Sequence, residues 1–541
     1  MTGCKKVIID VAIIGNGVAG LSAAISAAKN GANVTLFGYG NPASAKASGF
    51  NAIINNNDDS TLFFQDILIA GGLINNPLLV AELSIFANGF INFLENWGIN
   101  IKDMGKIGTR LSDGSSIPRT VFIEGEQLGL WLVQRLVQIL TKLNIKIINC
   151  RVDRVLYKEN LYILSGVTEN NEMVCCKTKS VIIATGGLGM LYRYTTNSSS
   201  SMGDGYRFAL DLGATLIDME FTQFGPFNFI LSPNSCRGRS VPLNLIAEGG
   251  RIINSLGEEF IPPALYGIRS YTKDKLTYMF YTEVLEGRGS PNGGVFCDLS
   301  NISDETLKRY PKFKEMCFSS EIDLKSSFIE VCPAYHCMMG GVMVDEKCST
   351  DVEGLFAAGE VMGGVHGSYR LGSNGITDAF CFGVIAGRNA ALFASKAKNI
   401  SLQNVKEIDL SVSQTEIKNN CDQELNTIKQ SFNNTMQEKV GLIRSEKGLL
   451  EAISQIEKIK QRVMLMAGSS KSNNYVGLKN LLDLGLIIAG SALRRRETLG
   501  VHFRSDYPFK KDNHKFSIAV RKKKETYVFG FMPRAFSTCW E

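Results

Sequence analysis

Several glycines of this chain stand where a bound phosphate would need them. Gly15, Gly17 and Gly20 form a G-x-G-x-x-G pattern between an apolar run, 7–14, and an alanine-rich segment, 18–29. In such a turn the first glycine permits the sharp bend, the second lets a pyrophosphate approach the backbone, and the third lets a helix pack closely on a strand. The start of the helix adds the positive end of its dipole. The pattern predicts a dinucleotide site at a strand–turn–helix unit.

A second group of residues suits the binding of a carboxylate. His336 and Arg370 both stand near glycines, and an arginine offers a carboxylate two parallel charged hydrogen bonds. The chain has only four histidines. We expect His366 at a site together with His336, His502 in packing between parts of the fold, and His514 at the surface.

These residues need a framework, which the hydrophobic pattern describes. Short β-branched runs predict buried strands, and apolar residues at helical spacing predict helices. The predicted strands are 7–14, 33–37, 180–184 and 355–358, and the predicted helices are 18–29 and 376–394. Mixed, aromatic-rich patterning predicts an inserted domain at about 225–332. A polar linker at 396–419 precedes a helical domain at about 421–496.

Composition excludes several classes of protein. The 541 residues favour two or three domains, and a net charge of +6 is too small for this length to indicate nucleic-acid binding. The 13 cysteines include no C-x-x-C pair, which favours a reduced cytosolic protein over a disulfide, zinc or iron–sulfur protein. The start of the chain does not read as a signal peptide, and no uninterrupted apolar stretch reaches about 18 residues, so no membrane span is expected. The basic runs 494–496 and 522–524 are expected to be solvated.

Seven further segments, in order along almost the whole chain, resemble the motifs of a known family. They are 184–187, 202–205, 218–224, His336 with Gly340 and Gly341, 354–360, 366–374 and 496–508. With the glycine-rich turn they resemble the flavoprotein subunit of fumarate reductase and succinate dehydrogenase. L-aspartate oxidase shares the same architecture.

The resemblance implies an α/β fold with FAD as the cofactor. A Rossmann-like FAD-binding domain (1–224 and 339–400) would carry an inserted α+β capping domain (225–338), a C-terminal helical domain (420–510) and a tail (511–541). The residues it assigns to FAD are Gly15, Gly17, Gly20, Ser44, Gly49, Thr185, Gly186, Gly187, Asp204, Glu360, Ser373 and Asn374. Ala43 stands where members with covalent flavin have a histidine, so non-covalent FAD is expected.

The departures from the family motifs concern the substrate. The resemblance implies that His336 and Arg370 grip one carboxylate, whereas the histidine and threonine that grip a second one fall on Gly225 and Ala247. Neither replacement offers a side-chain donor, and an unpaired buried carboxylate is costly. We therefore expect a carboxylic acid other than a simple dicarboxylate. Its larger or less charged far end would lie against Phe227 and Phe229, which follow the Gly225 replacement.

The resemblance also implies the chemistry, which is hydride transfer between flavin N5 and the carbon chain of the acid. The family's proton-transfer arginine aligns with Lys273, and Glu248 of the family's T-E-G motif is retained. The expected catalytic residues are therefore Lys273, His336, Arg370 and Glu248, with Arg269 as a reserve for proton transfer.

Two alternatives remain open at the level of the sequence. One is an L-aspartate oxidase-like amino-acid oxidase, and the other is an FAD-binding partner subunit with impaired catalysis. The resemblance makes an iron–sulfur electron-transfer protein a candidate partner. The expected location is cytoplasmic, either free or peripheral to the inner face of a membrane through that partner.

Overall fold

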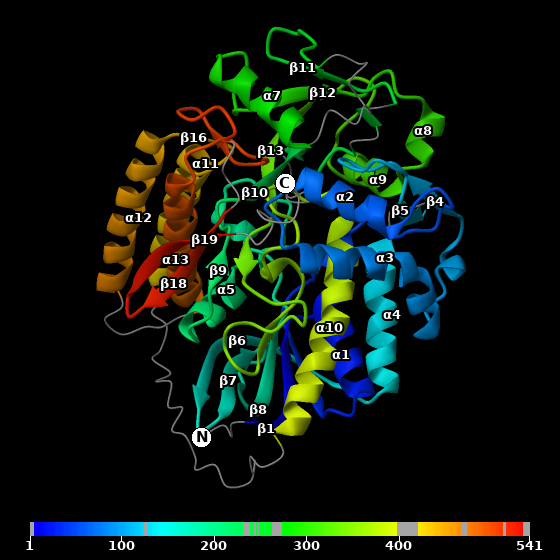
Figure 1. The fold of residues 1–541 in the computed structure, drawn as a ribbon. Coiled ribbons are helices and arrows are strands. Elements are labelled where there is room, and N and C mark those ends of the chain that lie inside the picture. The colour runs from blue at the N-terminus through cyan, green and yellow to red at the C-terminus, as the bar shows by residue number, and fades with distance from the viewer. Residues whose placement is uncertain are drawn as a thin grey trace.

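The chain folds into three regions around a central sheet (Figure 1). A computed structural model describes residues 5–123, 128–230, 239–242, 245–246, 248–261, 273–397, 420–466, 473–511 and 516–533. The FAD-binding region occupies the lower part of the view, the capping region the top, and the helical region one side. The architecture is the expected α/β fold with capping and helical domains, while the exact domain boundaries stay predictions.

The central sheet begins with the predicted β-α-β unit. Its strands are β1 (Lys5–Ile14), β2 (Val34–Gly38), β6 (Lys146–Lys158), β7 (Leu161–Thr168), β8 (Met173–Ile183) and β15 (Leu355–Ala357). β1 pairs in parallel with both β2 and β8, and β15 pairs in parallel with β8. Val11, Ala12 and Ile13 are fully buried, as expected for a parallel strand covered on both faces.

Helices α1 (Val18–Lys29) and α10 (Asn374–Lys396) pack against each other beside this sheet (Figure 1). Their close approach depends on glycine. A Cβ atom at Gly383 would lie 2.5 Å from the carbonyl oxygen of Ala19, and one at Gly387 would lie 2.3 Å from that of Ala23. Both helices therefore hold the glycine-rich turn against the sheet.

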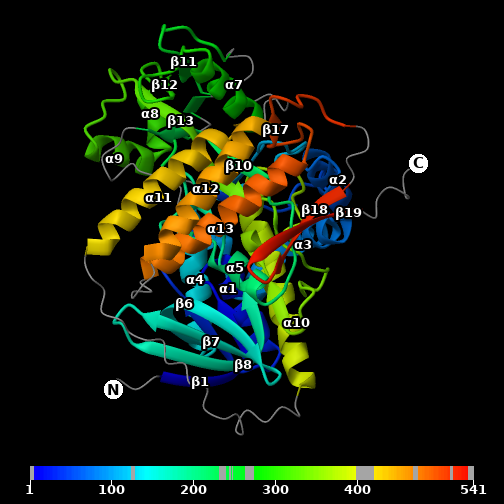
Figure 2. The same cartoon turned by 90° about the vertical axis from the view of Figure 1, so that its left-hand side faces the viewer.

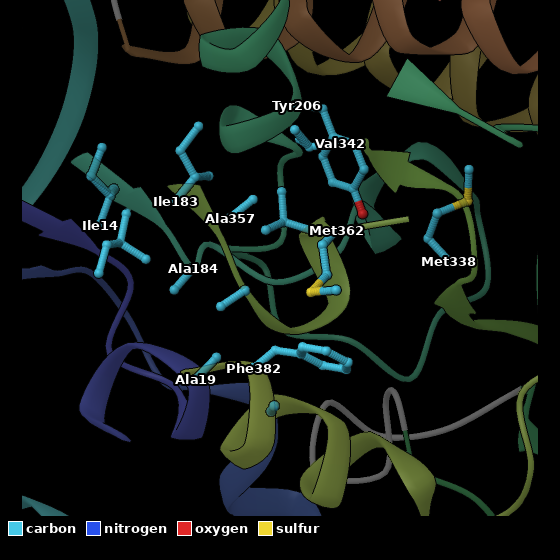
Figure 3. Packing of buried hydrophobic residues seen from close by; sticks show 14 of the residues in the cluster. Ile14, Ala19, Ile183, Ala184, Tyr206, Met338, Val342, Ala357, Met362 and Phe382 are labelled. Carbon is cyan, nitrogen blue, oxygen red and sulfur yellow. The ribbon is translucent and has the colours of Figure 1, made fainter. Parts of the chain in front are cut away.

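Figure 3 shows the packing just behind this turn. Ile14, Ile183 and Ala357 come from the ends of three neighbouring parallel strands, with Tyr206 and Met362 beyond them. The carboxyl ends of parallel strands in an open α/β sheet are where ligands bind. The core thus supports the site directly.

The remaining elements of the FAD-binding region cover the sheet or lead toward the capping region. The helices are α2 (Ser60–Ala70), α3 (Pro77–Asn96), α4 (Leu128–Lys142) and α5 (Asp204–Asp211). The short 3₁₀ turns are Ala43–Lys46, Ile101–Met104, Gly189–Leu191 and Gly359–Val361. A three-stranded sheet contains β3 (Gly49–Asn51), β5 (Thr120–Ile123) and β4 (Ile107–Arg110).

The capping region has a sheet and a hydrophobic core of its own. The sheet runs β10 (Thr222–Phe229), β13 (Ile329–Met338), β12 (Val295–Asp298) and β11 (Arg251–Ile253). The described helices are α7 (Lys273–Leu285), α8 (Asp304–Lys308) and α9 (Pro311–Ser319). The core is separate from that of the FAD-binding region. β10 begins and β13 ends at its border with the FAD-binding region, where the site lies.

The helical region packs along one side of the molecule (Figure 2). Its helices are α11 (Asn420–Lys439), α12 (Glu446–Met466) and α13 (Asn473–Arg494), and β16 (Ile443–Arg444) pairs with β17 (Phe503–Arg504). The predicted linker falls almost entirely outside the described residues. One basic segment differs from expectation, while Lys523 and Lys524 of the other are exposed as expected.

The run 494–496 is not simply solvated, because Arg495 is fully buried and paired with Glu220 and Glu497. The predicted tail also contains structure. β18 (Phe516–Lys523) and β19 (Thr526–Pro533) form a hairpin, and β18 pairs with β9 (Leu216–Ile217), which pairs with β14 (Gly341–Val342). Lys522 lies on this hairpin and pairs with Asp211 at 2.5 Å. Sequence patterning missed the hairpin because its outer strand is largely exposed.

Within the described part of the chain, three helices are long and apolar enough to cross a membrane, judged by length and composition alone. They are Pro77–Asn96, Asn374–Lys396 and Tyr475–Arg494. The expectation of no such segment required an unbroken apolar run, whereas these helices contain scattered polar residues. In the second and third, 67% and 72% of the apolar window is buried inside the fold. Packing within the chain therefore accounts for much of their hydropathy.

Candidate active site

A single large cavity connects the glycine-rich turn with the predicted carboxylate-binding residues. Its volume is about 880 Å³. Gly15 and Gly17 line it at one end of the predicted site, and His336, Arg370 and Lys273 line it as well. The cavity therefore brings together segments that lie far apart in the sequence.

The glycine-rich turn has the geometry that the sequence predicts. Gly15 has a φ of +125°, and a Cβ atom there would lie 2.0 Å from the carbonyl oxygen of Ala184. A Cβ atom at Gly20 would lie 1.9 Å from the carbonyl oxygen of Gly15. Gly17 precedes α1, and the Val18 amide donates a hydrogen bond of 3.2 Å to Oγ of Ser44. The open helix start and the bare turn form a cradle for a phosphate.

Most of the residues expected to contact FAD line this cavity. They are Gly15, Gly17, Ser44, Gly49, Thr185, Gly186, Gly187, Asp204, Glu360 and Ser373. Two others lie behind the wall: Gly20 packs on Gly15, and buried Asn374 faces the side chain of Asn51. These two support the site's backbone.

Glu360 is held in place by the backbone of the neighbouring motif. The Met338 amide donates a hydrogen bond of 3.1 Å to Oε1 of Glu360, and burial raises the pKa of this carboxyl. The carboxyl group faces the segment of Gly187, where a Cβ atom would lie 2.1 Å from Oε1. Gly187 is therefore required for close approach of these two segments.

Polar atoms along the cavity wall fit a polar cofactor. Among the described residues, buried side-chain atoms that lack a hydrogen-bond partner include Thr185 Oγ1, Asn197 Oδ1 and His366 Nδ1, and all three residues line the cavity. Buried polar groups in folded proteins are nearly always satisfied. A bound cofactor with ring nitrogens, carbonyls and ribose hydroxyls would satisfy them, so the residues present fit FAD. Ala43 lines the cavity with a methyl group, which cannot form a covalent bond to a flavin. Non-covalent binding of FAD stays a prediction.

Arg370 and His336 meet inside the cavity as the sequence predicts. Nη2 of Arg370 lies 3.1 Å from Nε2 of His336, and Nδ1 of His336 lies 3.1 Å from Oγ1 of Thr196. A guanidinium can only donate, so Nε2 accepts and Nδ1 carries the proton. Burial, with the charges of Arg370 and Lys273, holds the pKa of His336 well below its usual value. His336 is therefore neutral in this state.

Lys273 lies on the same cavity, at the start of α7, and its partner is a carboxylate that sequence reasoning missed. Its Nζ lies 3.9 Å from Oδ2 of Asp113, and its backbone amide lies 3.2 Å from Oδ1. The hydroxyl of Tyr369 donates a short hydrogen bond to Oδ2 of Asp113. Asp113 also lines the cavity.

Glu248 lines the cavity from the capping side but stands in a different cluster. It forms a short ion pair with Arg309, and the hydroxyl of Tyr310 lies 3.2 Å from its Oε1. Within the described ranges no contact joins Glu248 to Lys273 or His336. Arg269 and Ala247 lie outside the described residues.

The far end of the site differs from the prediction in two ways. Phe227 and Phe229 do not line the cavity, because both pack in the capping core, where Phe227 contacts Phe280. Gly225 does not line the cavity either, and a Cβ atom there would make ordinary van der Waals contacts, the nearest at 3.8 Å. However, Arg239 lines the cavity and brings a charged donor to it, which the expectation of a donor-poor wall did not include.

Some of the missed residues carried a signal in the sequence. Asp113 stands in an Asp-Gly pair that reads as a turn, and Tyr369 replaces the asparagine of the family's H-G-a-N-R motif. Thr196, Asn197 and Arg239 carried no such signal, because they lie in segments without motif or period. Only the fold brings them to the cavity.

Comparison with known proteins agrees with this arrangement. Residues 10–376 match the family described as FAD binding domain, and residues 429–539 match the one described as fumarate reductase flavoprotein C-term. A fumarate reductase (CoM/CoB) subunit of Methanothermobacter marburgensis is 32% identical, over 96% of this chain and 98% of the relative. L-aspartate oxidase of Agrobacterium fabrum is 30% identical, over 92% and 90%.

Solved structures extend the similarity to the whole fold. Mycobacterium smegmatis Sdh1 superposes with a TM-score of 0.84 at 27% identity, covering 98% of this chain and 95% of that one. Escherichia coli quinol fumarate reductase gives 0.84 at 25% identity, covering 99% and 98%. The shared sequence, fold and glycine-rich cavity establish that the chain is a member of the fumarate reductase and succinate dehydrogenase flavoprotein family of FAD-dependent oxidoreductases.

Proposed function

We propose that this chain is the flavoprotein subunit of an enzyme that interconverts an unsaturated dicarboxylic acid of the fumarate type and its saturated counterpart. The observation that carries the proposal is the pair formed by Arg370 and His336 in the cavity, 3.1 Å apart, with Nε of Arg370 left without a partner. Such a pair suits one carboxylate of the substrate.

The charges on the cavity support a second anionic group on the substrate. Arg239 lines the cavity and has no carboxylate within ion-pair distance among the described residues. Lys46 is near enough that the charge of Arg239 helps burial to lower its pKa. Two neighbouring cations without a carboxylate favour an anionic ligand. This modifies the expectation from the sequence, which pointed away from a simple dicarboxylate.

The protein residues then have distinct roles. Bound FAD supplies the two-electron redox chemistry and leaves positioning and proton transfer to the protein. Arg370 and His336 hold the carboxylate next to the reacting carbons, and Lys273 exchanges a proton with one of those carbons. A positioned general acid typically contributes about 10²–10⁴-fold to a rate.

The proposal includes an electron-transfer partner. The relative from Methanothermobacter marburgensis is named as one subunit of a fumarate reductase, and other relatives are named flavoprotein subunits. We infer that this chain also works beside a second protein chain and that an iron–sulfur protein is the kind of partner that fits. A cytoplasmic location stays a prediction.

The function is tested with the flavin itself as the reporter. The purified chain, loaded with FAD and reduced anaerobically with dithionite, is mixed with fumarate while the flavin absorbance is followed. We expect the oxidised spectrum to return and succinate to form in equal amount. Crotonate, which has one carboxylate, should react at least about tenfold more slowly, because it forfeits a charge-assisted contact.

Two controls make the result specific. Arg370→Lys keeps the charge but removes the planar fork, and should slow the reaction with fumarate. Arg496→Lys changes an arginine outside the cavity in the same way and should react like the wild type. A reduced flavin that is not reoxidised by fumarate would refute the proposal. Reduction of oxidised flavin by L-aspartate would favour the amino-acid oxidase instead.

A further inference from the structure

The partner of Lys273 in the structure is Asp113, and this pairing has a consequence for proton supply. We propose that Asp113 and Tyr369 complete a relay through Lys273, in which Asp113 returns a proton to Lys273 after Lys273 has given one to the substrate. The inference rests on the proposed function, because it concerns the proton of that reaction. Asp113 and Tyr369 act through Lys273 and are positioning residues.

The geometry ties the three side chains into one unit. Asp113 receives the Lys273 amide on Oδ1 at 3.2 Å, while the Lys273 ammonium lies 3.9 Å from Oδ2. The Tyr369 hydroxyl donates to Oδ2 of Asp113 and accepts a hydrogen bond of 3.1 Å from the Lys273 backbone amide. The carboxylate thus fixes the start of α7 and the ammonium group together.

The electrostatics suit a carboxyl group that changes protonation. Burial raises the pKa of Asp113, while the charge of Lys273 and the hydrogen bond from Tyr369 act in the opposite direction. Burial, Asp113 and Asp274 hold the pKa of Tyr369 well above its usual value, so the phenol stays protonated. Tyr369 therefore orients Asp113 as a donor, and Asp113 is the member that can carry the proton.

Asp113 is the buried member of this pair. Its side chain is 6% exposed, and that of Lys273 is 23% exposed. Asp113 and Lys273 both line the cavity. Glu248, the alternative proton carrier, is engaged by Arg309 on the capping side. Among the described contacts, Asp113 is therefore the carboxyl group placed to exchange a proton with Lys273.

Atoms and electrons balance in the reduction of fumarate. One carbon of the double bond receives a hydrogen together with its electron pair from reduced FAD, and Nζ of Lys273 gives the neighbouring carbon a proton. The neutral amine then takes the proton of the Asp113 carboxyl, and water reprotonates Asp113. Two electrons leave the cofactor, and two hydrogens join the acid.

The relay is tested by single-turnover oxidation of the reduced, FAD-loaded chain by fumarate. Lys273→Met and Asp113→Asn should each slow the step at least about 100-fold, consistent with loss of a general acid or its supply. The double variant should be no slower than Lys273→Met, because the two residues act in series. Flavin content and the binding of succinate should change less than about threefold. Asp103→Asn, an exposed carboxylate ten residues earlier, is the matched control and should react like the wild type.

Two further variants separate a relay from simple support of the fold. Asp113→Glu should recover part of the single-turnover rate. It should also restore a pH-dependent part of the pH–rate profile that Asp113→Asn lacks. Tyr369→Phe removes one hydroxyl and should shift the pH at which the single-turnover rate changes, while the flavin stays bound. Asp113→Asn at the wild-type rate, or a loss confined to Glu248→Gln, would overturn the relay while the proposed function stands. If fumarate does not reoxidise the reduced flavin of the wild-type chain, both the relay and the proposed function are refuted.

Discussion

At the scale of single residues, the contact between Arg370 and His336 determines how the site responds to pH. The imidazole accepts from the guanidinium in the state described, and its pKa is held well below the usual value by burial and by two nearby cations. A carboxylate in contact with the ring favours the protonated form. Binding of the acid should therefore raise the pKa of His336.

This predicts that a dicarboxylate binds together with a proton. Between the pKa of His336 in the free site and its higher pKa in the complex, affinity for succinate should weaken as the pH rises, toward about tenfold per pH unit, and above the pKa of the complex it should level off. Below the pKa of the free site the dependence should vanish, because His336 is then protonated before binding. Calorimetry in two buffers of different ionisation enthalpy measures the proton uptake. His336→Gln should bind more weakly and without uptake, whereas equal uptake in that variant would contradict the assignment.

Arg370 gives a second prediction at this scale. Removal of one partner of a buried charge pair typically costs about 2–5 kcal/mol in binding. Arg370→Met should therefore weaken succinate binding by roughly 30-fold or more, as read from flavin absorbance on titration. The FAD content should remain near that of the wild type, since Arg370 is assigned to the substrate. Unchanged succinate affinity would place the carboxylate elsewhere.

At the scale of elements, the turn between β1 and α1 combines two constraints on Gly15. Its φ is positive, and its Cα faces the carbonyl of Ala184. Gly31 also has a positive φ, +84°, but a Cβ atom there would meet nothing within 4 Å. Gly31 therefore carries only the constraint of a positive φ, whereas Gly15 carries that constraint and a steric clash of any added Cβ atom with Ala184.

Gly15→Ala should lose bound FAD, while Gly31→Ala should keep it. At Gly31 only the cost of the left-handed backbone applies, about 1–2 kcal/mol of stability. At Gly15 the added methyl also forces the turn away from β8, which disturbs the phosphate cradle. Flavin absorbance per protein after gel filtration measures the difference. A Gly15→Ala protein with full FAD content would show that the turn tolerates a side chain.

Periodicity predicted these elements well where one segment carried its own signal. Helix α1 has the predicted bounds, and β1, β2 and β15 differ by only one or two residues at their ends. The site was only partly predictable. His336 and Arg370 lie in recognisable motifs, whereas Arg239 and Thr196 reach the cavity through long-range packing that no local pattern encodes.

At the scale of the whole molecule, a buried ionic network joins the helical region to the strand that leads into the site. Arg495, just past the end of α13, bonds Oε1 of Glu220 at 2.5 Å, two residues before β10. Arg444 donates to the backbone of Glu220 and to Thr222 at 2.6 Å, and to His502 at 2.7 Å. The prediction that His502 serves packing between regions agrees with this contact. The network fixes the helical region to the capping strand.

Arg495→Met should therefore destabilise the fold and not only the helical region. Breaking a buried pair by removing one partner costs about 3–5 kcal/mol, because Glu220 is left buried and unpaired. The neighbouring Arg496 is 56% exposed, so Arg496→Met should change the free energy of unfolding by less than about 0.5 kcal/mol. Urea unfolding followed by tryptophan and flavin fluorescence measures both. Equal stabilities would mean that the network contributes little.

The position of the bound acid decides most of these predictions. A crystal structure of the FAD-loaded chain with fumarate measures it directly. We predict one carboxylate within about 3 Å of the Arg370 guanidinium and of His336, with the double bond between the flavin ring and Lys273. A fumarate bound away from Arg370, or a site in which Arg370 contacts only the cofactor, would contradict the proposed role of the Arg370–His336 pair.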